Sequence, residues 1–267
     1  MSKTAGRVRA GIGGWTYEPW EETFYPADLP KKSQLNYASR QVTAIEINGT
    51  FYRLQKPAVF AKWRDDAPED FVFAIKAPKY LTYRKVLSEA VPSVPRFLGS
   101  GLSELQHKLG PILWQLPPSL HFDAADIRAF LDALPRESDG LPLRHVLEVR
   151  HKTFMDAAYV ELARKHSVAT VFAHTDEFPN FADVTGDFVY VRLRKALATE
   201  ETGYSKPDLD AWSERAKLWS QGGAPADLPY VIKSAPPEKK PRDVFIFFIN
   251  GAKERAPAAA KHLLTLL

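Results

Sequence analysis

The strongest constraint on the fold is a series of short apolar segments, rich in β-branched and aromatic residues, that recurs along all 267 residues. Each runs for about four to eight residues and ends in Gly, Pro or polar side chains, as strands do. Most are apolar throughout rather than alternating, which is typical of parallel strands covered on both faces. The segments begin at Arg7, Thr43, Asp70, Gly110, Leu143, Ala169, Asp187 and Asp243.

Stretches with helical spacing lie between these segments. Pro57 suits the first position of a helix, and Asp123 is a predicted N-cap because apolar residues follow it at helical spacing. The other predicted helices cover residues 157–166, 208–221 and 256–267, with shorter ones over 33–40 and 102–109.

Eight strands that alternate with helices predict an α/β protein with a single (β/α)8 TIM barrel. A doubly wound sheet also alternates, but it usually has five or six strands. The two long connections, 16–32 and 222–242, have strands on both sides, so they are predicted to be loops rather than linkers. We therefore expect one domain over residues 1–267.

Composition and charge narrow the class of protein. Hydrophobic residues make up 45% of the chain and charged residues 25%, which excludes wholesale disorder. The absence of cysteine excludes disulfide frameworks, thiolate metal sites and cysteine nucleophiles. The net charge of +4 permits an anionic ligand without requiring nucleic acid. No apolar run approaches the roughly 20 residues of a membrane helix, and the basic N-terminus resembles no signal peptide, so we expect a cytoplasmic protein with no membrane partner.

Polar side chains close nearly every predicted strand. In TIM barrels the active site is built at the carboxyl ends of the strands and in the loops that follow them. Burying ionisable groups costs several kcal/mol each unless they are paired or bind something, so a ring of them at one end predicts a functional site.

Glu46 and Glu148 are the candidate acid and base, because general catalysis needs carboxylates whose pKa values differ. Lys76 is the third catalytic candidate, since lysine forms imines with carbonyl compounds when its pKa is lowered. Together with Lys76, Arg150 and Arg192 would suit a phosphate, a carboxylate or a developing oxyanion. The alternative for all five is a set of Glu–Arg and Glu–Lys pairs that holds the barrel mouth together.

Other polar and aromatic residues on the strand ends and loops are candidates for substrate binding. The asparagines and Gln115 would orient a substrate, and aromatic rings would stack on a sugar or base. The alternative for the aromatic residues is a packed lid over the barrel. The candidates are Trp15, Asn48, Tyr52, Gln115, His151, Tyr204 and Asn250, in addition to Arg150 and Arg192.

No metal site is predicted. His174 and Asp176, with Glu46 and Glu148, offer nitrogen and oxygen ligands, but no HxH or HExxH pattern accompanies them. The sequence requires no cofactor and leaves open whether one is used.

Seven motifs follow one another in order along the chain. They are GGWTYEPWEETFYP from Gly13, EINGTFYR from Glu46, FAIKAP from Phe73, LGPILWQLPP from Leu109, LEVRH from Leu147, VYVRLR from Val189 and FIFFINGAKERAPAAA from Phe245. This set resembles the DUF72 family from about residue 7 to the C-terminus. The resemblance implies a TIM barrel and no particular activity.

Two positions depart from the family pattern. Family members commonly carry a histidine where Tyr83 follows Thr82, and another where Arg194 stands in the segment that begins at Asp187. If the family's chemistry uses these histidines, this chain has altered or lost it.

The leading hypothesis is an enzyme that acts on a small anionic or polyhydroxy molecule by carboxylate acid/base chemistry at the carboxyl-terminal mouth of the barrel. Hydrolase, lyase and isomerase chemistry all fit these residues. Two alternatives stay open: a nucleic-acid-associated binding barrel, whose affinity would fall steeply with salt, and a non-catalytic scaffold. The sequence predicts no oligomeric state.

Overall fold

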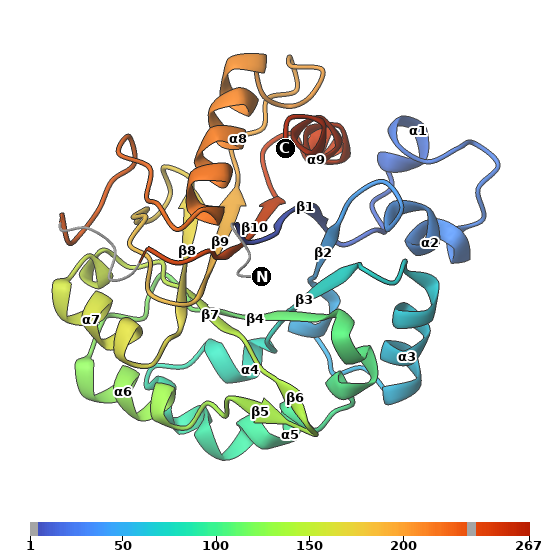
Figure 1. Ribbon diagram of the computed structural model, residues 1–267. Helices are drawn as coiled ribbons and strands as arrows, with labels where there is room; N and C mark the ends of the chain where they lie inside the picture. The colour runs from blue at the N-terminus through green and yellow to red at the C-terminus, as the bar shows by residue number, and fades with distance from the viewer. Residues whose placement is uncertain (1–4, 234–238) are drawn as a thin grey trace.

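Eight parallel strands close into a barrel in the computed structural model, which describes residues 5–233 and 239–267 (Figure 1). β10 completes the ring by pairing in parallel with β1, so the predicted (β/α)8 barrel is confirmed. Residues 1–4 of the basic N-terminus and 234–238 of the second long connection lie outside the described residues. In ring order the strands are β1 (Val8–Gly13), β2 (Ala44–Ile47), β3 (Val72–Lys76), β4 (Leu109–Gln115), β7 (His145–Glu148), β8 (Ala169–His174), β9 (Phe188–Leu193) and β10 (Asp243–Phe248).

Helices surround the strands (Figure 1). As predicted, α3 begins at Pro57, and the Asp123 carboxylate caps α6 by accepting the backbone N–H groups of Ala125 and Asp126. In the parts of the chain that the structure describes, no helix is long and apolar enough to cross a membrane. The helices are α1 (Trp20–Thr23), α2 (Gln34–Ala38), α3 (Pro57–Asp66), α4 (Lys79–Thr82), α5 (Val94–Leu98), α6 (Ala124–Asp132), α7 (Ala157–Lys165), α8 (Lys206–Ser220) and α9 (Ala256–Thr265).

One predicted helix has a different form. Residues Leu102–Lys108 form 3-10 turns rather than an α-helix. Gly101 before them and Gln106 within them have positive φ angles of 111° and 52°, which a continuous right-handed helix does not accommodate.

A two-stranded hairpin between α6 and β7 was not predicted. Its strands are β5 (Glu137–Ser138) and β6 (Leu141–Pro142), which pair antiparallel. Asp139 and Gly140 between them both have positive φ, as a two-residue type I′ turn requires. The Asp-Gly pair is the sequence signal for this hairpin.

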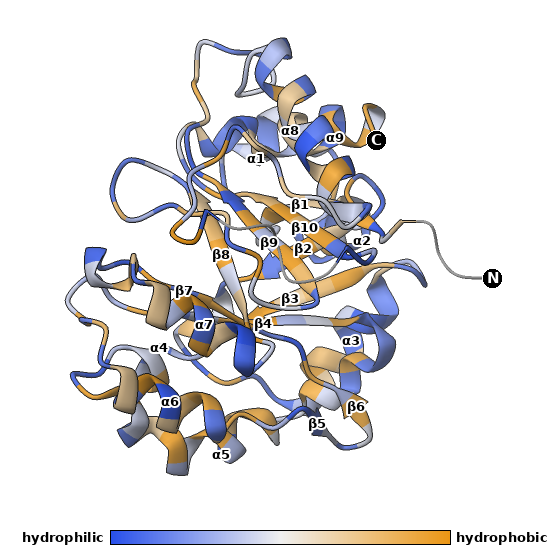
Figure 2. Cartoon of the chain, turned by 60° about the vertical axis from the view of Figure 1, so that its left-hand side comes forward, coloured by the Kyte–Doolittle hydropathy of each residue, from blue (hydrophilic) through white to orange (hydrophobic). Residues whose placement is uncertain are grey.

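Apolar side chains fill the barrel on both sides of the strands. Figure 2 shows mostly hydrophobic strands in the centre and helices with mixed hydrophilic and hydrophobic surfaces around them. Inside the barrel, small residues such as Ala44 and Ala74 lie in one cluster with the large rings of Tyr190, Phe245 and Phe247. This combination of small and large side chains closes the interior below the carboxyl ends of the strands.

A buried histidine makes the stability of this fold depend on pH. His145 accepts a hydrogen bond at Nδ1 from Trp114 Nε1 (3.1 Å), and its Nε2 lies 2.7 Å from the carbonyl oxygen of Pro135. Burial lowers the pKa of His145 from 6.5 to about 4. The unfolded chain therefore binds this proton more readily, and stability falls as pH decreases from 6.5 to about 4. The loss amounts to about 3 kcal/mol when complete.

Urea unfolding at pH 7 and pH 5 tests this dependence. The His145→Asn variant is expected to lose much less stability between the two pH values than the unsubstituted protein does. His107→Asn is the matched control, because His107 is half exposed and, in the part of the chain that the structure describes, pairs only with the exposed Glu69. An equal pH dependence in all three proteins would assign the effect to other groups.

Candidate functional site

The polar side chains at the strand ends form one layer of the barrel interior, directly above the apolar layer. Side chains alternate along a strand, so Ala44 and Glu46 share a face of β2, and Tyr190 and Arg192 share a face of β9. The strand register places polar residues of adjacent strands level with one another, and Gln115 of β4 pairs with Glu148 of β7 in this way. The interior polar layer comprises Glu46, Lys76, Gln115, Glu148 and Arg192, all of them buried.

Arg192 joins the two predicted catalytic carboxylates. Its Nη2 lies 3.0 Å from Glu46 Oε1, and its Nη1 donates to the Glu148 carboxylate. The Tyr190 hydroxyl donates to the other oxygen of Glu46 at 2.8 Å. Burial alone would lower the pKa of Arg192, but Glu148 and Glu46 outweigh it and raise that pKa. Arg192 is thus a permanent cation held between two carboxylates.

Arg150 provides a second cation for Glu148. Its Nε and Nη2 lie 3.0 and 2.8 Å from Glu148 Oε1, and Nη2 also donates to Gln115 Oε1 at 2.8 Å. Burial alone would raise the pKa of Glu148, but Arg192 and Arg150 outweigh it and lower that pKa to about 2. Glu148 is therefore ionised at neutral pH and is a weak base.

A cavity of about 370 Å³ opens at this end of the barrel, at the carboxyl ends of the strands. Among its described lining residues five are cationic and none carries a carboxylate. The cations are Lys76, Arg150, Arg192, Arg194 and Lys253. The neutral lining residues are Gly13, Asn48, Phe51, Tyr52, Tyr83, Gln115, Ile249 and Asn250.

Phe178, on the loop after β8, holds two of these cations. The guanidinium carbons of Arg150 and Arg194 lie 4.5 and 5.0 Å from the centroid of its ring. Arg194 also donates from Nη2 to Glu177 at 3.0 Å. Neither arginine has an acceptor for its Nη1 group among the described residues. Because both arginines line the cavity, these N–H groups are available to a ligand as donors.

Lys76 differs from these arginines because it has no carboxylate partner among the described residues. Its side chain is 8% exposed, and Nζ lies 4.1 Å from the centroid of the Phe51 ring. Within residues 5–233 and 239–267, Nζ takes part in no hydrogen bond or ion pair. Burial, together with the positive charge of Arg192, lowers the pKa of Lys76 to about 8.

Arg194, Tyr190, Lys253 and Tyr83 also belong to this site and were not predicted for it. Tyr190 holds Glu46, and its position two residues before Arg192 on the same strand was the available signal. Lys253 lies on the loop after β10 and packs over the ring of Tyr17. Tyr83, one of the two departures from the family pattern, lines the cavity and accepts a hydrogen bond from Gln115 Nε2 at 3.1 Å.

Three predicted substrate-binding residues do not line the cavity. Trp15 packs edge-on against Trp63, with ring centroids 5.2 Å apart. His151 stacks on His121 at 3.8 Å outside the cavity. Tyr204 is buried, and its hydroxyl accepts the backbone N–H of Lys195. The other predicted binding residues, Asn48, Tyr52, Gln115, Arg150, Arg192 and Asn250, line it.

The two metal-ligand candidates have other partners. The His174 ring packs against Trp212, with centroids 5.1 Å apart, and Asp176 forms an ion pair with Lys195 at 2.6 Å. The described part of the chain contains no group of three or more His, Asp or Glu side chains that could hold a metal ion.

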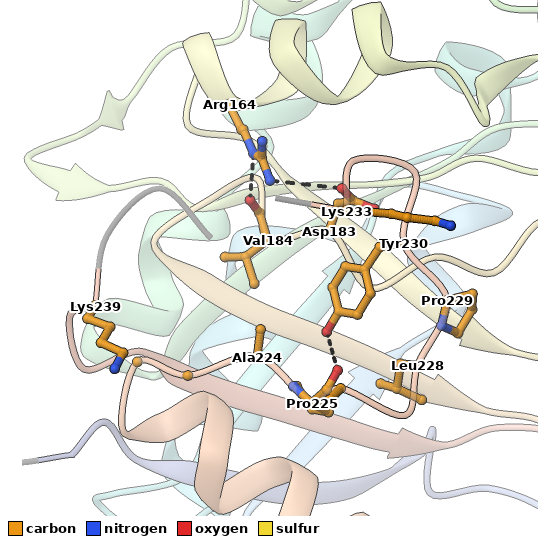
Figure 3. A pocket seen from close by; sticks show the side chains of 13 residues that line it. Arg164, Asp183, Val184, Ala224, Pro225, Leu228, Pro229, Tyr230, Lys233 and Lys239 are labelled. Carbon is orange, nitrogen blue, oxygen red and sulfur yellow. Dashed lines mark hydrogen bonds and ion pairs between the residues drawn. The ribbon is translucent and has the colours of Figure 1, made fainter. Parts of the chain in front are cut away.

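A larger cavity, about 810 Å³, is formed by loops at the opposite, amino-terminal end of the barrel (Figure 3). Polar groups of its wall bond to one another. Asp183 accepts the N–H groups of Val231 and Ile232. Arg164 donates to the Val184 carbonyl, and Tyr230 donates to the Pro225 carbonyl at 2.7 Å (Figure 3). Because this end of a TIM barrel serves stability, the cavity at the carboxyl ends of the strands is the better candidate.

A closed parallel barrel with a cation-rich cavity at the carboxyl ends of its strands defines a TIM-barrel protein whose candidate site lies where that fold places its active sites. The family can also be stated. The model of DUF72, described as a protein of unknown function, matches residues 9–267, and the chain belongs to this family.

Similarities to known proteins are consistent with this family assignment. The chain is 26% identical over 241 residues to the UPF0759 protein YecE of Escherichia coli (strain K12), covering 82% of this chain and 84% of the relative. It is 22% identical to the UPF0759 protein YunF of Bacillus subtilis (strain 168), covering 97% and 94%. The crystal structure of a DUF72 family protein from Thermotoga maritima is similar, with a TM-score of 0.73 and 21% identity over 97% of this chain and 98% of that chain. These similarities support the fold.

Proposed function

We propose that this protein is an enzyme that acts on a small anionic molecule at the carboxyl-terminal mouth of its barrel. The observation that carries the proposal is the lining of the cavity, with five cationic side chains and no carboxylate among its described residues. Guanidinium groups bind phosphate and carboxylate through paired, charge-assisted hydrogen bonds. Asn48 and Asn250 at the rim would orient hydroxyl groups of the substrate.

In this proposal the two glutamates hold the arginines in position and do not transfer protons. Glu148 is held by Arg150 and Arg192, and its low pKa makes it a poor proton acceptor. Glu46 is bound by Tyr190 and Arg192. Acid/base chemistry at neutral pH is better suited to Lys76, whose pKa of about 8 lies near the working pH. We therefore place Lys76, rather than either glutamate, at the reacting centre in this proposal.

Binding of inorganic phosphate, measured by calorimetry, tests the anion site. Arg194→Met removes a guanidinium that lines the cavity, and a charge-assisted hydrogen bond contributes about 1.5–3 kcal/mol. Phosphate affinity is therefore expected to fall about 10- to 100-fold.

Arg215→Met is a matched control for that substitution. Arg215 also pairs with one carboxylate, Asp227, and also lies over an aromatic ring, that of Trp212 at 4.5 Å, but it is not a lining residue of this cavity. Equal affinities in the two variants would exclude the cavity as the anion site. Tight binding of an oligonucleotide with a steep dependence on salt would favour the nucleic-acid alternative instead.

A further inference from the structure

Among the cations of the cavity, the two lysines differ from the arginines because neither has an ion-pair partner in the described chain, and Lys76 is the more deeply buried of the two. Arg192 and Arg150 are bound by glutamates, and Arg194 pairs with Glu177. Lys76 Nζ lies over the ring of Phe51, a cation–π contact, but has no hydrogen-bond acceptor or carboxylate partner within the described chain. A buried amine without an acceptor, next to guanidinium groups, is poorly suited to hold a positive charge. The same surroundings leave its lone pair available to an electrophile that enters the cavity.

We propose that Lys76 Nζ is a catalytic nucleophile that forms an imine with the aldehyde or ketone carbonyl of a small molecule bearing a carboxylate or phosphate. This inference rests on the proposed function, because the anionic group must be held by the arginines. It adds the chemical class of the substrate and the covalent role of Lys76. A neutral amine is the reactive form, and burial provides about a tenth of it at pH 7.

The bonds and protons of the step balance as follows. The lone pair of neutral Nζ forms a bond to the carbonyl carbon, and the π electrons of the carbonyl move to its oxygen. One proton passes from nitrogen to that oxygen, and a proton donor in the cavity wall supplies a second and is reprotonated from solvent. The oxygen then leaves as water with the C–O bonding electrons, and the nitrogen lone pair completes the C=N bond of the protonated imine.

Tyr83 is placed to deliver the second proton. Its hydroxyl oxygen accepts a hydrogen bond from Gln115 Nε2 at 3.1 Å, and Tyr83 lines the same cavity as Lys76. Because that oxygen is the acceptor in this contact, its own O–H is left to donate elsewhere. The leaving oxygen of the intermediate is the acceptor that the step provides.

Borohydride trapping on the full chain tests the proposal. The protein is incubated with glyoxylate, with glycolaldehyde phosphate or with neutral glycolaldehyde, then reduced, and the modified peptide is identified by mass spectrometry. We expect an adduct on Lys76 with one or both charged carbonyl compounds, formed about 10- to 100-fold faster than with glycolaldehyde. Comparing the two charged compounds distinguishes a carboxylate from a phosphate substrate. The initial rate should increase about tenfold from pH 7 to pH 9 as Nζ is deprotonated.

Three variants accompany this experiment. Lys76→Met should abolish the adduct, whereas Lys253→Met, which removes the other lysine and one cation of the cavity wall, should slow trapping but leave the adduct on Lys76. Tyr83→Phe keeps the ring, and it should slow trapping about 100-fold, a typical contribution of a proton donor.

The outcomes separate this inference from the proposed function. Phosphate binding that depends on Arg194, without any adduct on Lys76, would overturn the covalent role and leave the anion site standing. If phosphate binding does not depend on Arg194 and no adduct forms on Lys76, both proposals are overturned. An adduct that forms equally fast with neutral glycolaldehyde, or mainly on Lys253, would refute the assigned substrate class or the assigned nucleophile.

Discussion

Arg192→Met is expected to destabilise the protein by about 3–5 kcal/mol, because it leaves buried carboxylates without their cation. Among the described residues, Glu46 loses its ion-pair partner and keeps the hydrogen bond from the Tyr190 hydroxyl. Glu148 loses one of its two arginines but keeps Arg150. Thermal unfolding should show a decrease on the order of 10 °C for a chain of this length.

A second substitution in the Arg192→Met background identifies the cause of this loss. Glu46→Gln removes the uncompensated charge and can still accept the hydrogen bond of Tyr190, so it should restore much of the lost stability. Glu148→Gln in the same background should not, because it deprives Arg150 of its carboxylate. If both substitutions restored stability equally, the loss would have to come from general crowding of negative charge rather than from Glu46.

The strand order and the polar layer could be predicted from the sequence because both depend on local patterns. Apolar runs locate the strands, and the alternation of side chains places Glu46, Glu148 and Arg192 on the interior face of their strands. The general rule for TIM barrels then places these residues at the mouth. Each of these steps uses only neighbouring residues and a property of the fold.

The pairing within that layer could not be predicted in the same way. Arg192 meets Glu46 only because closure of the barrel joins segments that lie 146 positions apart, and sequence spacing carries no information on such contacts. The placement of loop side chains is harder still to predict, because no periodicity of the sequence determines the direction in which they point. Trp15 and Tyr204, both predicted to bind substrate, pack against neighbouring residues instead.

Lys76→Met is expected to have the opposite effect to Arg192→Met and to stabilise the protein. The pKa of Lys76 is lowered from 10.5 to about 8 in the folded chain, so the folded state holds this proton less well than the unfolded state does. The cost to stability is fully present below pH 8 and disappears as pH rises to 10.5. At pH 7 it amounts to about 3 kcal/mol, and methionine at this site removes it.

The pH dependence of the gain distinguishes this cause from improved packing. The stability of the Lys76→Met variant relative to the unsubstituted protein should be largest at pH 7 and should decrease when unfolding is measured at pH 9. A gain that is independent of pH would indicate packing against Phe51 instead, and a loss of stability would show that Lys76 supports the fold. A buried lysine that destabilises its own fold is expected where catalysis, rather than stability, requires the amine. Stabilisation by Lys76→Met together with loss of the trapped adduct would therefore assign Lys76 to function and Arg192 to the support of the site.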